Sequence, residues 1–512
     1  MNIEKDLNPA QLEAVRNTEG PLLILAGAGS GKTRVITYRI AYLIDFCRVE
    51  PAHVLAVTFT NKAAEQMKNR VLSLLRSHQT GSPLISTFHS FCVRVLRRYI
   101  RALEYNNDFS IYDEADQLNT VKGCLRELGL DEKAYSPRSV LSRISYAKNH
   151  GISPEGLYAQ AFDPKSERMA VLYDLYEKRL KSSSALDFDD LLLKAVLLLA
   201  QETSIREMLN HQYRYILVDE YQDTNRVQYQ LIRLLTQARQ NLCVVGDEDQ
   251  SIYGWRGADL QNILSFEQDY PNSRIIKLEQ NYRSTQAILD AAGAVVSNNE
   301  ERKGKTLWTV KKEGELVSLF EAPDAESEAL FVVERILLHQ RVHPLDTAAV
   351  LYRTNFQSRL FEEACRRSNL RYLVVGGFSF YERAEIKDVL AYLKLCLNPS
   401  DSLGFMRVIN TPPRGLGKSS LHALEQEARA HDLSMWEAMN RVIGSRSMSA
   451  RIIKAFEDFR EVLKEPMEKV ATLPLSKLIS QIVEGSGYTR WLEEDGTEEA
   501  RSRMENIEEL VN

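Results

Sequence analysis

The chain has 512 residues, a formal net charge of -5, 44% hydrophobic residues and 26% charged residues. This length predicts several domains, and the composition is that of an ordinary globular protein rather than a disordered or fibrous one. The slightly acidic balance excludes bulk basic charge as a source of nucleic-acid affinity, so any basic surface must be local. We expect no signal peptide, lipidation motif or membrane-length apolar segment. The six cysteines lack metal-ligand spacing, which predicts reduced thiols in a cytoplasmic protein.

Short apolar runs that end in glycine, aromatic or acidic residues predict an α/β domain with a buried parallel sheet. The runs occur in residues 1–90 and again in residues 200–280, whereas residues 91–199 show helical patterns and no strong strand. We therefore expect one sheet domain that is interrupted by a helical insertion. The strands are expected at Leu22–Ala26, Val54–Phe59, Leu84–Phe88, Ile216–Val218, Leu242–Val245 and Ile275–Leu278.

A second unit with strands is expected in residues 281–377, at Leu316–Phe320, Ala348–Tyr352 and Tyr372–Val375. Residues 378–512 are expected to be a second, mainly helical insertion, broken by NTPPRGLGKSS at Asn410–Ser420. Near the end, Met504, Ile507 and Val511 form an i, i+3, i+7 stripe, but no C-cap residue follows it. This pattern predicts a helix that is cut, so we expect the second insertion to be incomplete.

The segment AGAGSGKT fits a phosphate-binding loop, although the strict pattern opens with glycine where this chain has Ala26. The remaining glycines let the backbone direct N–H groups at phosphate oxygens, and the following helix adds its positive N-terminus. Lys32 is expected to reach the β- and γ-phosphates and Thr33 to offer its hydroxyl to Mg²⁺. A flexible glycine turn is the alternative, but a strand before and a helix after favour the loop. Its residues are Ala26, Gly27, Ala28, Gly29, Ser30, Gly31, Lys32 and Thr33.

Two carboxylates, Asp219 and Glu220, follow the expected strand Ile216–Val218. Such a pair suits one Mg²⁺ contact, assigned to Asp219, and one base that orients water, assigned to Glu220. An isolated Asp-Glu pair is usually a solvated loop, but the phosphate-binding loop upstream favours catalysis. Beyond the next strand, Gln250 is placed to touch the γ-phosphate, with a surface turn residue as its alternative.

Aromatic residues lie close to several expected strand ends. Tyr253, Trp255 and Arg256 share a glycine-containing stretch, whereas Phe59 and the Phe88-His89 pair follow two other strands. One such site is compatible with a core residue. Three sites at the strand ends of one domain favour base stacking along a track for single-stranded nucleic acid.

The motif order is similar to that of superfamily 1 DNA helicases of the UvrD/Rep/PcrA family. That family has P-loop NTPase motor domains with RecA-like parallel sheets and two mainly helical insertions. The resemblance covers essentially the whole chain, so the ordered series is specific. It is carried by LNPAQLEAV, GAGSGKT, TFTNKAA, TFHSF, LDFDD, VDEYQDTN, GDEDQSIYGWRG, LEQNYRS, YRTNFQSRLFEE, FYERAEIKD and PPRGLG.

The resemblance implies roles for individual residues. Gln11 reads adenine, Tyr282 stacks on it, Arg34 contacts the nucleotide, and Arg283 is an arginine finger at the γ-phosphate. Arg353 and Asn355 could equally be an ordinary strand-end pair. A plain helix-capping turn is nearly as good an account of the glycine turn near residue 415. The DNA path implied in this way comprises Thr58, Phe59, Asn61, Thr87, His89, Tyr253, Trp255, Arg256, Arg353, Asn355, Arg414, Gly415, Gly417 and Lys418.

Two segments of the family, Lys-Gly-Leu-Glu and Thr-Arg-Ala with a second arginine finger, do not occur in the chain. We therefore expect an incomplete second motor domain, in either an N-terminal fragment or a natural truncation, and the uncapped final helix favours the fragment. The expected activity is that of an ATP- and Mg²⁺-dependent helicase that moves 3′ to 5′ on single-stranded DNA and unwinds duplex at single-strand/duplex junctions. DNA repair or replication proteins are expected partners, and no membrane is involved. A helicase subunit of a nuclease complex and a non-catalytic DNA-binding fragment are the alternatives.

Overall fold

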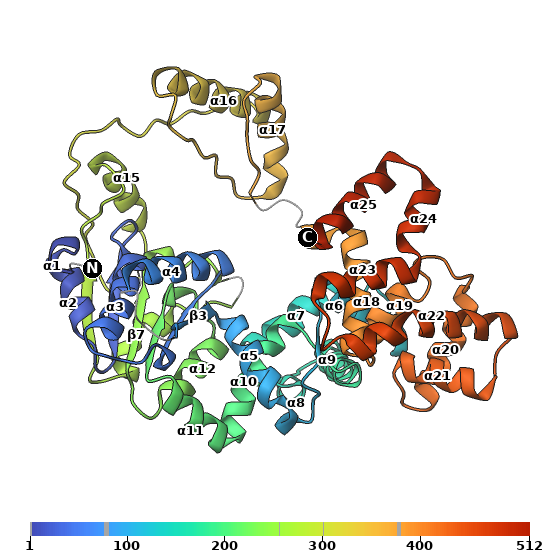
Figure 1. Cartoon of the computed structure of the whole chain (residues 1–512). Coiled ribbons are helices and arrows are strands. Elements are labelled where there is room, and N and C mark those ends of the chain that lie inside the picture. Colours follow the sequence, from blue (N-terminus) through green and yellow to red (C-terminus); the bar gives the residue numbers. More distant parts are fainter. Residues whose placement is uncertain (1–2, 76–80, 255–256, 301, 376–379, 512) are drawn as a thin grey trace.

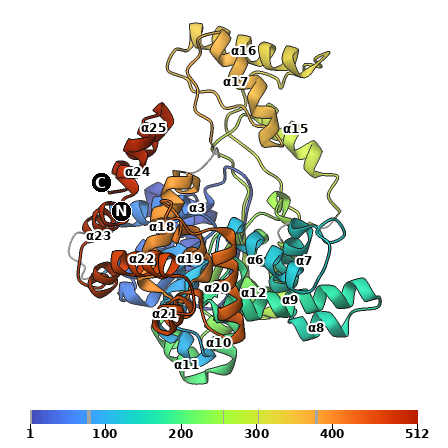
Figure 2. The same cartoon turned by 90° about the vertical axis from the view of Figure 1, so that its right-hand side faces the viewer.

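The computed structural model describes residues 3–75, 81–254, 257–300, 302–375 and 380–511. Figure 1 shows a sheet domain that contains the N-terminus, a separate pair of helices, and a large group of C-terminal helices next to a helical insertion. The isolated pair is α16 (Ala325–Val342) and α17 (Ser358–Arg367), which stands apart in both views (Figures 1 and 2). None of the helices in this part of the chain combines the length and apolarity that crossing a membrane requires.

The central sheet has six parallel strands in the order β3-β2-β6-β7-β1-β8. Every strand of the predicted sheet is present to within one residue at either end. The α/β prediction is therefore confirmed. The strands are β1 (Leu22–Ala26), β2 (Val54–Thr58), β3 (Leu84–Thr87), β6 (Tyr215–Val218), β7 (Leu242–Gly246) and β8 (Arg274–Leu278).

The strands are apolar along their whole length because helices cover both faces of the sheet. Leu23 and Leu25 of β1 pack into one core, and Leu22 and Ile24 pack into the core on the opposite face. Since all strands are parallel, their carboxyl ends meet at one edge, which is where α/β proteins place their sites. One core contains residues of α3 (Lys32–Asp45) and α4 (Asn61–Leu74), and the other contains residues of α5 (Phe88–Tyr99), α10 (Phe188–Gln201) and α12 (Arg226–Thr236).

The helical insertion is shorter than residues 91–199. Helices α5 and α10, at the two ends of that range, bury their apolar faces against the sheet and so belong to the sheet domain. Helix α10 begins at a capping box, in which Asp190 N donates to the Asp187 side chain at 2.8 Å. The insertion has its own core, built by α6 (Glu114–Glu127), α7 (Pro137–Asn149), α8 (Pro154–Ala159) and α9 (Pro164–Ser182). A two-stranded pair of β4 (Ser110–Ile111) and β5 (Ala185–Leu186) joins them.

The three strands expected after residue 281 do not form, and this prediction was wrong. Among the described residues of 281–375, no segment joins a sheet, and Leu319 and Leu351 of the expected strands are 97% and 91% exposed. A strand needs a neighbour to accept its backbone hydrogen bonds, and these runs have none beside them. Helices α16 and α17 instead pack on each other through a small core that includes Ala329, Val333 and Ala364.

Residues from 384 to 511 are mainly helical, as their pattern indicates, and they share one core, whereas their assignment as an insertion stays a prediction. Ile507 is buried in that core, and Met504 and Val511 pack beside it, so the predicted stripe is confirmed. The unit contacts the insertion through Asn398, whose amide donates to Ser110 Oγ and to the carbonyl oxygens of Ser183 and Ser184, each at 3.1 Å. Its helices are α18 (Ala384–Leu397), α19 (Ser402–Val408), α20 (Lys418–Ala430), α21 (Met435–Ser445), α22 (Ala450–Lys469), α23 (Leu475–Ser486), α24 (Tyr488–Asp495) and α25 (Glu498–Val511).

Candidate functional site

The predicted phosphate-binding loop joins the end of β1 to the start of α3. Gly29 and Gly31 have φ angles of +70° and +91°, a backbone conformation that glycine adopts without strain. The Ser30 hydroxyl donates to the carbonyl of Gly27 at 2.7 Å and closes the turn. Helix α3 then begins at Lys32, so the first N–H groups of the helix lie at the loop, as anion binding requires.

The loop lysine faces a carboxylate that follows β6. Lys32 Nζ lies 3.1 Å from Glu220 Oε2, so two predicted catalytic residues meet across the carboxyl edge of the sheet. Asp219 is 5% exposed, and its Oδ1 accepts the N–H of Glu220 at 3.1 Å. Burial, and then the charge of Glu220, raise the pKa of Asp219 to about 7. A nearby dication would stabilise the charged form of such a carboxylate.

A hydrogen-bonded network connects Glu220 with the predicted γ-phosphate contact, Gln250. The amide of the buried Gln222 donates to Glu220 Oε2 at 2.9 Å, and its carbonyl oxygen accepts the N–H of Asp247 at 2.9 Å. The Gln250 amide donates to the carboxylate of that same Asp247. Gln222 was missed by the sequence analysis, although it lies inside the acidic signature VDEYQDTN. The network joins the ends of β6 and β7.

The residues expected around the nucleotide gather at the same loop. The Gln11 amide donates to Ser30 O at 2.9 Å, and Tyr282 N donates to Gly29 O at 3.0 Å. Asn281, which was not predicted, donates its amide to Ala28 O at 2.6 Å. The exposed Tyr282 ring is held by Asn8, which donates to its hydroxyl at 2.8 Å.

Two arginines complete the predicted nucleotide set. Arg283 follows Tyr282 directly, and its Cβ lies 2.8 Å from where a side chain on Gly29 would begin. Arg34 lies in the first turn of α3 and donates to Asp6 O at 2.6 Å. The structure thus brings the predicted nucleotide residues to one place, whereas their individual roles stay predictions.

The predicted DNA residues at the ends of β2 and β3 lie together. The rings of Phe59 and Phe88 meet edge to face at 5.9 Å, and Phe88 itself is buried in the core. The His89 ring lies 4.9 Å from the ring of Phe188, which is 54% exposed. Phe188 was missed, although it lies in the LDFDD motif. A half-exposed aromatic ring beside His89 is suited to stacking on a base.

Polar residues of the predicted DNA path frame these rings. Thr58 and Thr87 end their strands and are buried, and the Thr87 hydroxyl accepts the N–H of Ser90 at 3.1 Å. Asn61 is exposed at the start of α4. Burial lowers the pKa of His89 to about 4, so its ring is neutral near pH 7.

The structure does not bring the other predicted DNA residues to the rings at the ends of β2 and β3. Tyr253 is 39% exposed beyond β7, and Trp255 and Arg256 lie outside the described residues. Arg353 and Asn355 are exposed next to α17, in the part of the chain that stands apart from the sheet (Figure 1). Their assignment stays a prediction.

The glycine turn before α20 lies far from the sheet, in the C-terminal unit (Figure 1). The Arg414 guanidinium donates to Val408 O at 2.9 Å and to the Tyr392 hydroxyl at 2.7 Å, and it also lies over the ring of Phe459. These contacts favour a structural role for Arg414. Gly415 has a φ of +71°, Gly417 caps α20, and Lys418 is exposed at its first turn, so a backbone contact with DNA stays a prediction for these three.

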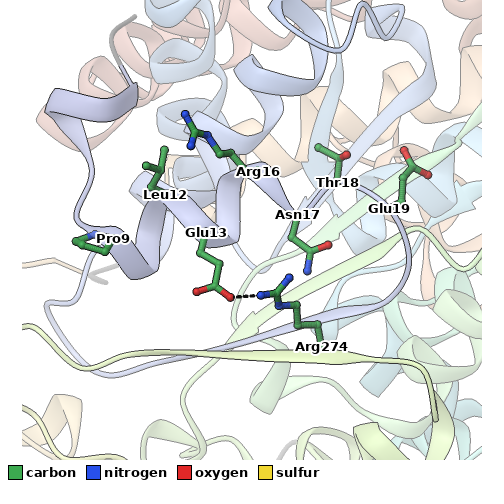
Figure 3. Close-up of a pocket in the computed structure, with 8 residues that line it drawn as sticks. All are labelled: Pro9, Leu12, Glu13, Arg16, Asn17, Thr18, Glu19 and Arg274. Carbon is green, nitrogen blue, oxygen red and sulfur yellow. Dashed lines mark hydrogen bonds and ion pairs between the residues drawn. The ribbon is translucent and has the colours of Figure 1, made fainter.

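An open hollow of about 660 Å³ lies between α2 (Pro9–Arg16) and β8 (Figure 3). Glu13 and Arg274 form an ion pair of 2.5 Å across it. Arg16 pairs with Glu4 at 2.7 Å. The main charged groups of the hollow are thus already paired, and none of the residues predicted to bind ATP lines it. We assign it no ligand.

The arrangement defines a class of protein. A glycine loop between a parallel strand and a helix, a lysine in its first turn, and acidic residues at the end of a neighbouring strand are the parts of a P-loop nucleoside-triphosphate site. Aromatic rings lie at the same edge of the sheet, at the ends of β2 and β3.

The comparisons with known proteins identify the family. Residues 7–271 match the UvrD/REP helicase N-terminal domain, and residues 276–512 match the UvrD-like helicase C-terminal domain. The chain belongs to the UvrD/REP helicase family, and the resemblance noted from its motifs is confirmed at this level.

Curated relatives include the ATP-dependent DNA helicases PcrA of Staphylococcus aureus (strain Mu50) and Bacillus subtilis (strain 168). The chain is 45% identical to the first over 508 residues and 47% identical to the second over 509 residues. Both alignments cover 99% of this chain. They cover 69% of the length of the S. aureus protein and 68% of the length of the B. subtilis protein.

Proposed function

We propose that this chain is an ATP-dependent DNA helicase and translocase that moves 3′ to 5′ on single-stranded DNA. The observation that carries the proposal is the contact of 3.1 Å between Lys32 and Glu220 at the phosphate-binding loop, because it joins a phosphate ligand to a carboxylate that can orient water. Membership of the UvrD/REP family and the names of the relatives, which are DNA helicases, support the choice of DNA as the second ligand.

In this proposal ATP binds at the loop and takes over Lys32 from Glu220. The side chain of Lys32 is 11% exposed, so its charge acts on the phosphates with little screening by water. Once released, Glu220 accepts a proton from the attacking water. Thr33 and the buried Asp219 fit Mg²⁺, which when bound supplies positive charge to the phosphate oxygens. The guanidinium of Arg283 stabilises the negative charge that develops on the phosphoryl oxygens in the transition state.

The DNA strand is proposed to cross the carboxyl edge of the sheet, over the aromatic residues that end β2 and β3. Stacking on these rings is tolerant of sequence, which suits a translocase. The Gln222 network gives a route by which the state of the nucleotide reaches the end of β7, whose following loop leads towards Tyr253. Two parts of the chain that bind the DNA strand tightly in turn would convert ATP hydrolysis into movement along the strand.

The test measures phosphate release with and without single-stranded DNA, and strand displacement on duplexes with either a 3′ or a 5′ tail. We expect hydrolysis to rise with DNA and displacement to require the 3′ tail. Nuclease activity of the purified chain would favour the nuclease-complex alternative, and DNA binding without any hydrolysis would favour the non-catalytic one.

We also propose that the 512-residue chain is a weak motor. The support is that no sheet forms among the described residues of 281–375, so the face that would close over the nucleotide lacks strands. Robust strand displacement by the 512-residue chain would contradict this. A cytoplasmic location and a role in DNA repair or replication complete the proposal.

A further inference from the structure

A buried lysine lies in the segment that leaves the sheet domain after α15 (Gln286–Val296). Lys305 Nζ lies 2.7 Å from Asp247 Oδ1, 2.8 Å from Glu248 Oε2 and 2.8 Å from Asp249 Oδ2. Its side chain is only 2% exposed. A single cation therefore meets three consecutive carboxylates directly before Gln250.

The three carboxylates depend on this partner. The side chains of Asp247, Glu248 and Asp249 are 3%, 0% and 9% exposed, and buried carboxylates are costly without a nearby cation. Arg302 adds a bidentate contact with Asp249, at 2.7 and 2.8 Å. Burial alone would lower the pKa of Lys305, but the carboxylates around it raise that pKa above its ordinary value, so the lysine remains charged.

Asp247 connects this cluster to the nucleotide site. One of its carboxylate oxygens contacts Lys305, and the other accepts the Gln250 amide. Its backbone N–H donates to Gln222, whose amide reaches Glu220. The Asp247 carboxylate, and with it the Gln250 amide, is therefore held by Lys305 together with the N–H of Asp249, which donates to the same carboxylate oxygen at 3.2 Å.

The residues after Lys305 are fixed to the nucleotide loop and its neighbours. Trp308 pairs with the chain after β8, since Trp308 N donates to Glu279 O at 3.0 Å and Trp308 O accepts Asn281 N at 2.8 Å. The Leu307 side chain covers Gly27, where an added Cβ would lie 2.2 Å from Leu307 Cδ2. One short segment thus contacts the phosphate-binding loop and the Gln250 loop together.

We propose that Lys305 is a positioning residue for ATP hydrolysis, which holds the Gln250 amide in place through Asp247 and so links the segment that leads to α16 with the nucleotide site. The inference rests on the proposed function and deepens it. The side chain of Lys305 is only 2% exposed, and its ammonium group contacts three carboxylates. Lys305 therefore acts on Gln250 and not on the nucleotide.

The test compares kcat and KM for ATP in the presence of a thymidine oligonucleotide. Lys305→Ala should lower kcat by about ten- to a hundredfold, as a displaced catalytic group does, with KM for ATP changed by less than about threefold. Lys305→Arg should recover most of the rate because it keeps the charge. Lys303→Ala is the matched control and should behave as wild type, since Lys303 lies in the same segment as Lys305 but pairs with the exposed Glu267 of α14 (Phe266–Asp269).

A double variant separates positioning from a general loss of structure. If Lys305 acts through Gln250, Lys305→Ala combined with Gln250→Ala should be no slower than Gln250→Ala alone. Additive losses in kcat, or a rise in KM that accounts for the whole effect, would overturn the inference. If Lys305→Ala does not fold, Lys305→Met combined with Glu248→Gln removes one charge of each sign and must show the same loss of kcat. A wild-type chain without DNA-stimulated hydrolysis would overturn the proposed function instead.

Discussion

Replacing Glu220 by glutamine should separate ATP binding from ATP hydrolysis. The variant keeps the size of the side chain and removes the charge that now holds Lys32 at 3.1 Å. Without a base to accept the proton of water, kcat should fall by about 10²–10⁴. Loss of the Glu220 charge also removes one of the causes that raise the pKa of Asp219, so Asp219 stays available as a carboxylate and binding of Mg²⁺ with ATP should survive.

The same substitution should slightly tighten ATP binding, because ATP no longer competes with Glu220 for Lys32. An exposed ion pair is worth about 0.2–1 kcal/mol. Since the Glu220 side chain is 36% exposed, we take the lower part of this range, about 0.2–0.6 kcal/mol, which is an affinity gain of up to roughly threefold.

Titration with a fluorescent ATP analogue that resists hydrolysis measures the affinity, and phosphate release measures the rate. Glu104→Gln is a matched control, because Glu104 is an exposed acid that pairs with Lys181, and it should change neither quantity. Wild-type hydrolysis by Glu220→Gln would place the base elsewhere. Weaker binding of the analogue would refute the competition for Lys32.

Three further outcomes are expected. Lys32→Ala should abolish ATP hydrolysis and leave the thermal unfolding profile in place, and an unchanged rate in a folded variant would exclude the phosphate-binding loop. Trp255→Ala should weaken binding of a single-stranded oligonucleotide by about 1–3 kcal/mol, the usual worth of a base stack, and unaltered binding would remove Trp255 from the track. Burial lowers the pKa of His89 from 6.5 to about 4, so its contribution to stability is complete above pH 6.5 and is lost as the pH falls towards 4. His89→Gln should therefore lose less thermal stability than wild type between pH 7 and 5, and equal losses would show that His89 does not titrate in this way.

The sheet was predictable from the sequence because its strands are buried on both faces. In β1, every residue from Leu22 to Ala26 is apolar and buried, so the run itself specifies a central parallel strand. The run Leu316–Phe320 carries the same local preference for a strand, but it remains unpaired. Local pattern reports what a segment prefers, whereas a sheet also needs a partner strand at the right place.

The residues of the candidate site, like the strands, were predictable where local sequence specifies them and not where distant contacts do. Lys32 was predicted because it belongs to the glycine-loop motif AGAGSGKT, and Glu220 because it follows a recognisable strand. Lys305 was not predicted, because its role depends on a contact with Asp249, which lies 56 residues away along the chain. The charges offered a signal that could have been used: the acidic run GDED and the later basic run RKGK are complementary. Nothing in either run specifies that they meet, because that follows from the path of the chain around β8.

The chain between Thr309 and α16 has a consequence for how the parts work together. Residues 310–324 form neither helix nor strand, and even fully extended they span only roughly 50 Å. The unit of α16 and α17 is therefore confined to a small volume around the carboxyl edge of the sheet, at an effective concentration of the order of millimolar. Its encounters with the nucleotide loop are intramolecular, so they are insensitive to dilution of the protein, and weak contacts are enough to bring the two parts together.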